Sequence, residues 1–315
     1  MTIGVQKIEC MRIIICDVGD AACAYVTSKN GHTMMIDCGS NEFKENPVDV
    51  FHRCKKWLGS KDYYTQRGEI YPITLLHITH PDKDHVRNAS RIIKEIPPYL
   101  LKKEPFEKFP DGDEIHTDYV EKIDKVYRGT NPEDIDWGFE YNKICQIPIE
   151  KCVSTNSLKE KVRNNSSILR YIKEDGVGIL FCGDLEKPGW EYLVANNPNF
   201  INLLKENGGN VLIAPHHGHK SGFPAALFDA IGDVDVVIHS KDTEASKEGT
   251  DVSSQYTNKA GGHIYNVISD GQYSYFGKVL TTRSNGNVFI DTNNGHGLYS
   301  IWTDKASPNH DKYRK

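Results

Sequence analysis

Four side chains that commonly bind divalent metals fall within six positions of the chain: His80, Asp82, Asp84 and His85. They directly follow the apolar, β-branched run of residues 73–78, which predicts a buried strand ending just before them. A loop at the end of a buried strand can turn several imidazole and carboxylate groups toward one point, as a divalent cation requires. The spacing therefore predicts a metal site in a catalytic loop, and a solvated turn that caps a helix is the alternative.

Two later loops carry further ligands in the same arrangement. Asp184 follows the apolar run 177–182, and His216 and His217 follow the run 210–214. These ligands are too many for one ion, so we expect two ions roughly 3.5–4 Å apart, bridged by a carboxylate and a water or hydroxide. Asp184 stands alone on its loop and is the natural bridge. The mixture of imidazole and carboxylate suits Zn²⁺, Mn²⁺ or Fe²⁺, and the lack of thiolate ligands argues against a structural zinc site.

The elements that must position these loops alternate between strand and helix patterns. The Asn30-Gly31 dipeptide is a strong two-residue turn signal between two strand patterns. We predict strands at 12–16, 22–27, 33–37, 73–78, 167–171, 177–182, 210–214 and 234–239, and helices at about 47–58, 86–96, 187 onward and 223–231. The runs 275–276, 279–280 and 287–290 predict a terminal hairpin or meander around Asn285-Gly286.

Composition bounds the domain organisation. The chain has 315 residues, of which 38% are hydrophobic and 26% charged, enough for a normal globular core. We expect one domain over residues 1–315, with a variable insertion at about 99–150 and a frayed C-terminus. The insertion is rich in Lys, Glu, Asp and Pro, and its charges predict a solvated face, with a lid over the site as the alternative.

Charge and cysteine usage bound the cellular context. The net charge of −5 creates no strong field for nucleic acid or an anionic membrane, although a metal site would supply local positive charge. No stretch approaches 18 consecutive apolar residues, and the N-terminal segment is too polar for a signal peptide. The eight cysteines form no C-x-x-C pair, which favours reduced, buried thiols in a cytoplasmic protein.

The motifs together resemble those of the metallo-β-lactamase superfamily, whose signature is H-x-H-x-D-H. Residues 80–85 read His-Pro-Asp-Lys-Asp-His, with Asp82 in place of the second His. That replacement, with Gly183-Asp184 and Pro215-His216-His217-Gly218, is most similar to the soluble hydrolase domain of the ComEC-type DNA-uptake channel and its free-standing relatives. Residues 17–21, 35–39 and 164–167 resemble other segments of that group, and the resemblance covers about residues 11–240.

The resemblance implies an α/β fold, a four-layer αββα sandwich, and hydrolysis by metal-bound hydroxide. It implies two divalent ions, Zn or Mn, and we expect Asp84 and Asp184 to be the catalytic residues. By position, His80 and Asp82 would hold the first ion, Asp84 and His85 the second, Asp184 would bridge, and His216 would complete the second site. ComEC-type domains are implied to be nucleases acting on DNA, often with Mn²⁺.

The sequence departs from the family pattern at two places. The usual third ligand of the first metal is a His ahead of Asp184, but the only one there, His116, lies in the variable segment. Asn165, Ser167 or a water are the alternatives. The later His-Pro motif is missing after Ser240, where His239 or His263 would have to replace it or serve an ordinary structural role.

Several neighbouring residues have two open interpretations. His217 is either a direct ligand or a support for His216. Asp37 either stabilises a turn through its side chain or forms part of a polar rim around the site. His219, Lys220 and Ser221 lie where a helix N-terminus could meet a phosphate.

Three functions remain open. The first is a two-metal phosphodiesterase, a nuclease acting on DNA or RNA. The second is a hydrolase of a small ester, lactone or cyclic nucleotide, which the acidic net charge favours slightly. The third is a non-catalytic binding module that retains the fold.

Overall fold

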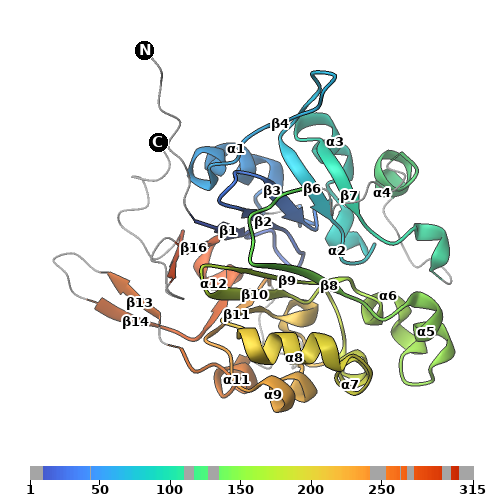
Figure 1. The fold of residues 1–315 in the computed structure, drawn as a ribbon, viewed down its shortest axis with the longest axis vertical. Coiled ribbons are helices and arrows are strands. Elements are labelled where there is room, and N and C mark those ends of the chain that lie inside the picture. The colour runs from blue at the N-terminus through green and yellow to red at the C-terminus, as the bar shows by residue number, and fades with distance from the viewer. Residues whose placement is uncertain are drawn as a thin grey trace.

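Two β-sheets built from the apolar runs of the sequence lie face to face at the centre of the computed structural model (Figure 1). The structure describes residues 10–42, 44–109, 117–126, 135–241, 253–262, 264–267, 273–292 and 299–304. Within these ranges the first sheet has seven strands in the order β17-β16-β1-β2-β3-β6-β7, and the second has six in the order β15-β12-β11-β10-β9-β8.

The strands of the first sheet are β1 (Arg12–Ile15), β2 (Ala24–Thr27), β3 (Thr33–Ile36), β6 (Ile73–His77), β7 (Pro98–Lys102), β16 (Val288–Asp291) and β17 (Ser300–Thr303). Those of the second are β8 (Tyr141–Cys145), β9 (Leu169–Glu174), β10 (Val177–Phe181), β11 (Val211–Ile213), β12 (Val236–His239) and β15 (Val279–Thr281). Two short hairpins are formed by β4 (Tyr63–Tyr64) with β5 (Ile70–Tyr71) and by β13 (Ile264–Val267) with β14 (Tyr273–Gly277).

Side chains of the central strands alternate between two hydrophobic layers, because successive residues of a strand face opposite sides of its sheet. In β1, Ile13 and Ile15 enter the core between the sheets, while Ile14 packs beneath the helices of the first sheet. In β10, Phe181 enters the core between the sheets and Leu180 faces the helices of the second. The fully apolar runs of the sequence thus belong to strands that are buried on both faces.

Helices cover the outer face of each sheet (Figure 1). Over the first sheet lie α1 (Pro47–Leu58), α2 (Lys83–Val86), α3 (Ala89–Glu95) and α4 (Thr117–Tyr119). Over the second lie α5 (Ile149–Ser154), α6 (Val162–Asn165), α7 (Lys187–Asn196), α8 (Pro198–Asn207), α9 (Ala225–Ile231) and α11 (Ser253–Thr257). The order helix, sheet, sheet, helix confirms the predicted four-layer αββα sandwich of the α/β class.

Local sequence signals account for the hairpin and the first helix. β2 and β3 pair antiparallel from Ala24↔Ile36 to Thr27↔Thr33, which confirms the predicted hairpin. The predicted two-residue turn is wrong, because the five residues 28–32 join the strands and the amide of Gly31 donates to the carbonyl oxygen of Ser28. Helix α1 has the predicted bounds. The side chain of Asn46 caps it by accepting a hydrogen bond from the amide of Val48, and Gly59 ends it at a φ of 65°.

The predicted terminal hairpin around Asn285-Gly286 is wrong. β15 pairs parallel with β12 in the second sheet, whereas β16 pairs antiparallel with β1 in the first. The short helix α12 (Thr282–Asn285) carries the chain from one sheet to the other. The apolar pattern of these strands marks burial, but it does not identify the neighbour of each strand.

The predicted helix at 86–96 is interrupted. It consists of α2, which begins earlier at Lys83, and α3, with Arg87 and Asn88 between them. The amide of Asn88 donates hydrogen bonds to the carbonyl oxygen of Cys38 and to Oγ of Ser40. These contacts tie the junction of the two helices to the loop after β3.

The predicted insertion at 99–150 begins and ends inside the sheets. β7 lies at one edge of the first sheet and β8 at one edge of the second. Between them, Tyr119 and Ile123 pack into the helical layer over the first sheet, beside α3. Residues 110–116 and 127–134 lie outside the described part of the chain, as does His116, and so do His263 and the predicted frayed end from residue 305.

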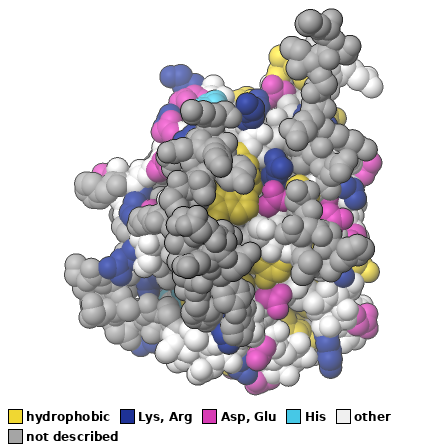
Figure 2. Space-filling model, turned by 90° about the vertical axis from the view of Figure 1, so that its left-hand side faces the viewer, with side chains coloured by type: hydrophobic (Ala, Val, Ile, Leu, Met, Phe, Trp, Pro, Cys, Tyr) yellow, Lys and Arg dark blue, Asp and Glu magenta, His cyan; other side chains and the backbone are white. Residues whose placement is uncertain are grey.

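The surface carries mixed charges. On the face drawn in Figure 2, the described Lys and Arg side chains are interspersed with Asp and Glu side chains. In the parts of the chain that the structure describes, no helix is both long and apolar enough to cross a membrane.

Candidate metal centre

The predicted ligand loops meet at the carboxyl ends of parallel strands. β3 and β6 run parallel in the first sheet, and β10, β11 and β12 run parallel in the second. Because parallel strands end at the same edge of a sheet, the loops that follow them are neighbours. Asp184 follows β10, and His216 and His217 lie in the 3₁₀ turn η5 (Pro215–Gly218) after β11.

One oxygen of Asp184 faces a compact group of ligands. Its Oδ1 lies 3.2 Å from Nε2 of His85 and 3.7 Å from Nε2 of His217. The same His217 nitrogen lies 3.2 Å from Oδ2 of Asp84. One ligand atom from each of Asp84, His85, Asp184 and His217 lies within 4.8 Å of all the others. We refer to these four residues as the compact set.

The other oxygen of Asp184 faces a second group. Its Oδ2 lies 3.7 Å from Nε2 of His80 and 3.7 Å from Nε2 of His216. Nε2 of His80 lies 3.7 Å from Oδ2 of Asp82 as well. We call His80, Asp82 and His216, with Oδ2 of Asp184, the open set.

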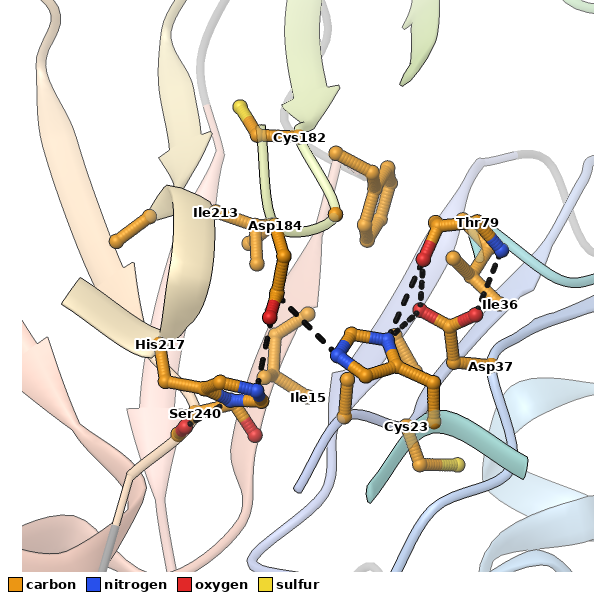
Figure 3. A pocket seen from close by; sticks show the side chains of 16 residues that line it. Ile15, Cys23, Ile36, Asp37, Thr79, Cys182, Asp184, Ile213, His217 and Ser240 are labelled. Carbon is orange, nitrogen blue, oxygen red and sulfur yellow. Dashed lines mark hydrogen bonds and ion pairs between the residues drawn. The ribbon is translucent and has the colours of Figure 1, made fainter. Parts of the chain in front are cut away.

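Both histidines of the compact set form hydrogen bonds through Nδ1, the ring nitrogen that faces away from Asp184. Nδ1 of His85 donates to Oδ2 of Asp37 at 2.8 Å, and Nδ1 of His217 donates to the carbonyl oxygen of Ser240 at 2.9 Å. Figure 3 shows the ring of His217 beside the carboxylate of Asp184, with Asp37 and Thr79 on the other side of the pocket. A partner at Nδ1 leaves Nε2 available for a metal and fixes the ring orientation.

The histidines of the open set are held in the same way. Nδ1 of His80 lies 3.2 Å from Oγ1 of Thr79. Nδ1 of His216 lies 2.9 Å from Oγ of Ser221 and 3.3 Å from Oε1 of Glu186. All four imidazoles therefore present Nε2 to the carboxylate of Asp184.

Ser167 connects Asp184 to the open set. Its Oγ accepts a hydrogen bond from the amide of Asp184 at 3.1 Å and lies 3.5 Å from Nδ1 of His80. The side chain of Asn165 instead donates to the carbonyl oxygen of Leu158 at 3.2 Å. Of the two predicted alternatives at the third-ligand position, only Ser167 touches the residues of the centre in these contacts.

The protonation equilibria of the histidines reflect the carboxylates around them. Burial acts to lower the pKa of His85, but Asp184 and Asp37 outweigh it and raise that pKa well above its usual value. Burial likewise acts to lower the pKa of His217, and Asp184 and Asp84 raise it to about 9. For His80 burial prevails, and the neighbouring His85 lowers its pKa further.

The donor set fits divalent cations. Among the described residues, the buried Nε2 of His80 has no hydrogen-bond partner, which is costly in a folded protein. Burial acts to raise the pKa of Asp184, but the histidines around it lower that pKa well below its usual value. Imidazole nitrogens and ionised carboxylates that converge in this way are the ligands of Zn²⁺ and Mn²⁺ sites.

The backbone at the centre is strained. His216 and His217 have φ of 49° and 53°, in the left-handed region that non-glycine residues rarely adopt, and Asp37 has φ of 56°. Such strain is typical of functional sites when the surroundings enforce it. At Gly39 the loops approach so closely that a Cβ would lie 1.5 Å from the carbonyl oxygen of Asp84.

A small pocket with a volume of about 40 Å³ adjoins the compact set (Figure 3). Asp184, His85 and His217 form its polar part. Its remaining wall is largely apolar and comes from both sheets, with Ile15, Ala24, Ile36, Phe181 and Ile213.

The structure thus brings together every predicted metal ligand: His80, Asp82, Asp84, His85, Asp184 and His216. Their roles as ligands stay predictions. One placement differs from the expectation, since His217, and not His216, lies with Asp84 and His85. The two histidines occupy consecutive left-handed positions, a conformation that the sequence pattern does not reveal.

The remaining predicted site residues lie around the centre. Asp37 belongs to the polar support behind His85, and Ser221 to that behind His216. His219 contacts Oγ of Ser221 through Nδ1 at 2.9 Å, and Lys220 is exposed. His239, considered as a replacement ligand, is fully buried with its ring 4.9 Å from that of Tyr256.

Two residues of the centre were not predicted. Thr79 donates from its amide and its hydroxyl to the carboxylate of Asp37, and Arg163 forms an ion pair of 3.0 Å with Asp82. Thr79 directly precedes the His80 motif, and Arg163 directly precedes the 164–167 segment. This adjacency is the only sequence signal that could have indicated a role in the centre. Residue type alone marks neither, because Thr and Arg are common in loops.

Comparisons with known proteins give structural neighbours only. No protein-family model matches the chain, and no curated protein sequence matches it. Among solved structures, the metallo-β-lactamase fold protein YhfI from Bacillus subtilis is similar with a TM-score of 0.48 and 10% identity, over 89% of this chain and 99% of that one.

Two further structures are more distant. The metallo-β-lactamase MIM-1 from Novosphingobium pentaromativorans has a TM-score of 0.34 and 12% identity, over 69% of this chain and 86% of that one. A protein from Thermotoga maritima, described as a candidate Zn-dependent hydrolase of the metallo-β-lactamase superfamily, has a TM-score of 0.37 and 11% identity, over 85% of this chain and 98% of that one.

Proposed function

We propose that the protein is a dinuclear metal-dependent hydrolase of the metallo-β-lactamase superfamily that cleaves phosphodiesters, with DNA or RNA as substrate. The observation that carries this proposal is the orientation of Asp184, whose Oδ1 faces the compact set and whose Oδ2 faces the open set. A carboxylate with ligands on both sides is what a bridged pair of ions requires. Zn²⁺ and Mn²⁺ are the ions we expect.

The chemistry divides between the ions and the chain. Two divalent ions, when bound, supply an activated water and neutralise charge that develops on phosphoryl oxygens. Asp84 and Asp184 supply negative charge to hold the ions, and Asp37 and Glu186 orient the imidazoles. Arg163, at the open set, offers a guanidinium of the kind that binds phosphate groups.

A reducing, cytoplasmic location is part of the proposal. All eight cysteines belong to the described residues, and each is a buried free thiol. Burial raises the pKa of Cys145 and of Cys152 to about 12, so these thiols remain protonated and unreactive. Such usage is typical of proteins of the cytoplasm.

The activity is tested on purified protein stripped with a chelator and reloaded with Mn²⁺ or Zn²⁺. Linear duplex DNA, single-stranded DNA, RNA and bis(p-nitrophenyl) phosphate are the substrates. We expect metal-dependent cleavage that Asp184→Asn removes. Asp229→Asn, on the outer helix α9 with a side chain 76% exposed, is the matched control and should leave it intact. Fully metallated protein that cleaves none of these substrates would contradict the proposal.

A small ester, lactone or cyclic nucleotide is the second candidate, and the acidic net charge of the chain favours it slightly. A panel of p-nitrophenyl esters, lactones and cyclic nucleotides distinguishes the two. Salt dependence is a second criterion, because the binding of a polyanion weakens steeply with salt whereas that of an uncharged ester does not. A non-catalytic binding module is the third candidate. Metal analysis that finds less than one ion per chain after metal-replete purification would favour it.

A further inference from the structure

The tandem histidines of the turn after β11 point to opposite sides of Asp184. His216 and His217 are adjacent, yet their ring centroids are 6.4 Å apart and the ring planes differ by 64°. Nε2 of His217 lies 3.7 Å from Oδ1 of Asp184, and Nε2 of His216 lies 3.7 Å from Oδ2. The two oxygens of one carboxylate therefore each face one of the two imidazoles.

The backbone conformation produces this divergence at a cost. Both residues adopt left-handed φ and ψ, 49° and 50° for His216 and 53° and 19° for His217. For an L-residue that conformation costs roughly 1–2 kcal/mol. Two consecutive examples indicate that the surroundings hold the turn in place. Gly218, which follows with φ of 79°, lies so close to the ring of His239 that a Cβ there would be 2.1 Å from Nδ1.

A polar cluster fixes the imidazole of His216. Nδ1 lies 3.3 Å from Oε1 of Glu186, and the hydroxyl of Ser221 donates to the same carboxylate oxygen at 3.2 Å. The amide of Asn164 lies within 3.5 Å of that oxygen. The pair of Glu186 and His216 repeats, on the open side, the arrangement of Asp37 and His85 on the compact side. A carboxylate behind an imidazole is the usual support of a metal-ligating histidine.

In the described ranges, no histidine from the segment ahead of Asp184 belongs to the open set. Ser167 occupies that place, and its hydroxyl is engaged with the amide of Asp184. With His216, the open set has two imidazoles and its own carboxylate, Asp82, beside the shared Asp184. The compact set has the same composition, with His85, His217 and Asp84. Each side then offers a complete set of protein ligands.

We propose that His216 is a ligand of the ion on the open side of Asp184, that His217 is a ligand of the ion on the compact side, and that Glu186 positions His216. This inference rests on the proposed dinuclear site. It reassigns His216 from the second ion to the first and supplies the third ligand that the sequence pattern lacks.

The test measures metal binding, without substrate, by calorimetry with Mn²⁺ and by elemental analysis of desalted protein. Wild-type protein should bind two ions, with the electron paramagnetic resonance signal of a coupled pair. His216→Ala should bind one ion tightly and lose the coupled signal. Glu186→Gln should weaken the binding of one ion by about 10–100-fold and leave the affinity for the other ion unchanged. His52→Ala, at an exposed histidine of α1, is the control and should match wild type.

Double variants assign each histidine to its side. In a His85→Ala background, which disables the compact set, adding His216→Ala should abolish binding and adding His217→Ala should not. In a His80→Ala background the two outcomes should be reversed. Circular dichroism verifies that each variant folds. If an alanine variant does not fold, the metal affinities of Glu186→Gln still test the inference.

The outcomes separate this inference from the proposed function. Wild-type protein that binds fewer than two ions would overturn both. Wild-type protein that binds two ions, with His216→Ala also binding two at unchanged affinity, would overturn only the inference. Protein that binds two ions and loses one in His216→Ala supports the inference, whether or not it cleaves nucleic acid.

Discussion

Nδ1 of His85 lies 2.8 Å from Oδ2 of Asp37, and the two residues are only 1% and 2% exposed. The same carboxylate accepts hydrogen bonds from the amide and the hydroxyl of Thr79 at 2.7 and 2.8 Å. Asp37 therefore links the loop after β3 to the metal-ligand loop after β6. This contact makes the geometry of the compact set depend on a residue outside it.

Replacing Asp37 with Ala should weaken both the fold and the compact set. Loss of a buried carboxylate with three donors leaves those donors unpaired, so we expect the free energy of unfolding to fall by about 2–5 kcal/mol. The ion on the compact side should bind about 10–100-fold more weakly. Urea unfolding of metal-free protein and Mn²⁺ calorimetry measure the two effects. An unchanged affinity would show that Asp37 does not orient His85.

Gly39 should be intolerant of any side chain. A Cβ there would lie 1.5 Å from the carbonyl oxygen of Asp84, which also accepts a hydrogen bond from the amide of Ala22. Gly39→Ala should displace the Asp84 loop, lower the free energy of unfolding by about 3 kcal/mol or more, and reduce metal binding.

The matched control for Gly39 is Gly209→Ala, where a Cβ would meet its nearest neighbour at 3.6 Å, an ordinary contact. This variant should change stability little. Equal stability of the two variants would contradict the close approach of the two loops.

Glu174 should make stability depend on pH. The residue is fully buried on β9, and burial raises its pKa to about 8, although a backbone hydrogen bond from Lys29 acts to lower that pKa. Because the pKa in the folded state exceeds that of the unfolded chain, the contribution of Glu174 to stability is complete below about pH 4.5. It is lost as pH rises toward 8.

Glu174→Gln removes this titration, so we expect little difference from wild type at pH 5 and a more stable variant at pH 8, by about 1–4 kcal/mol. Urea unfolding at both values measures the difference. A variant whose advantage does not grow with pH would show that Glu174 ionises normally in the folded protein.

Arg163→Met should affect binding of a phosphodiester more than metal binding. If the guanidinium contacts phosphate, KM for DNA at saturating Mn²⁺ should rise. The slope of log affinity against log salt concentration should also decrease in magnitude by about one, as for the loss of one phosphate contact. Lys56→Met, an exposed residue of α1, should leave both unchanged. A KM equal to that of wild type would place Arg163 in a purely structural ion pair with Asp82.

Much of the fold could be predicted because local signals determine it. The Asn30-Gly31 dipeptide marks the loop between β2 and β3, and apolar runs such as 177–182 identify strands buried on both faces. Strand partnership is not local. Residues 279–281 and 288–291 are close in the chain but join different sheets. The first run forms an edge strand beside β12, and the second lies between β1 and β17.

The residues of the candidate centre were predictable from the sequence, but which histidine faces which oxygen of Asp184 was not. Ligand type and order placed Asp84, His85 and Asp184 in one site. The division of His216 and His217 between two sides depends on consecutive left-handed residues and on Glu186, and neither has a sequence signature. Thr79 and Arg163 act through contacts with residues remote in the chain, which spacing does not encode.

The most direct test of the account is a crystal structure of Mn²⁺- or Zn²⁺-loaded protein with anomalous diffraction data. The account predicts two anomalous peaks roughly 3.5–4 Å apart, one beside each carboxylate oxygen of Asp184. The peak on the Oδ1 side should contact His85 and His217, and that on the Oδ2 side His80 and His216. A single peak, or peaks that do not share Asp184, would contradict it.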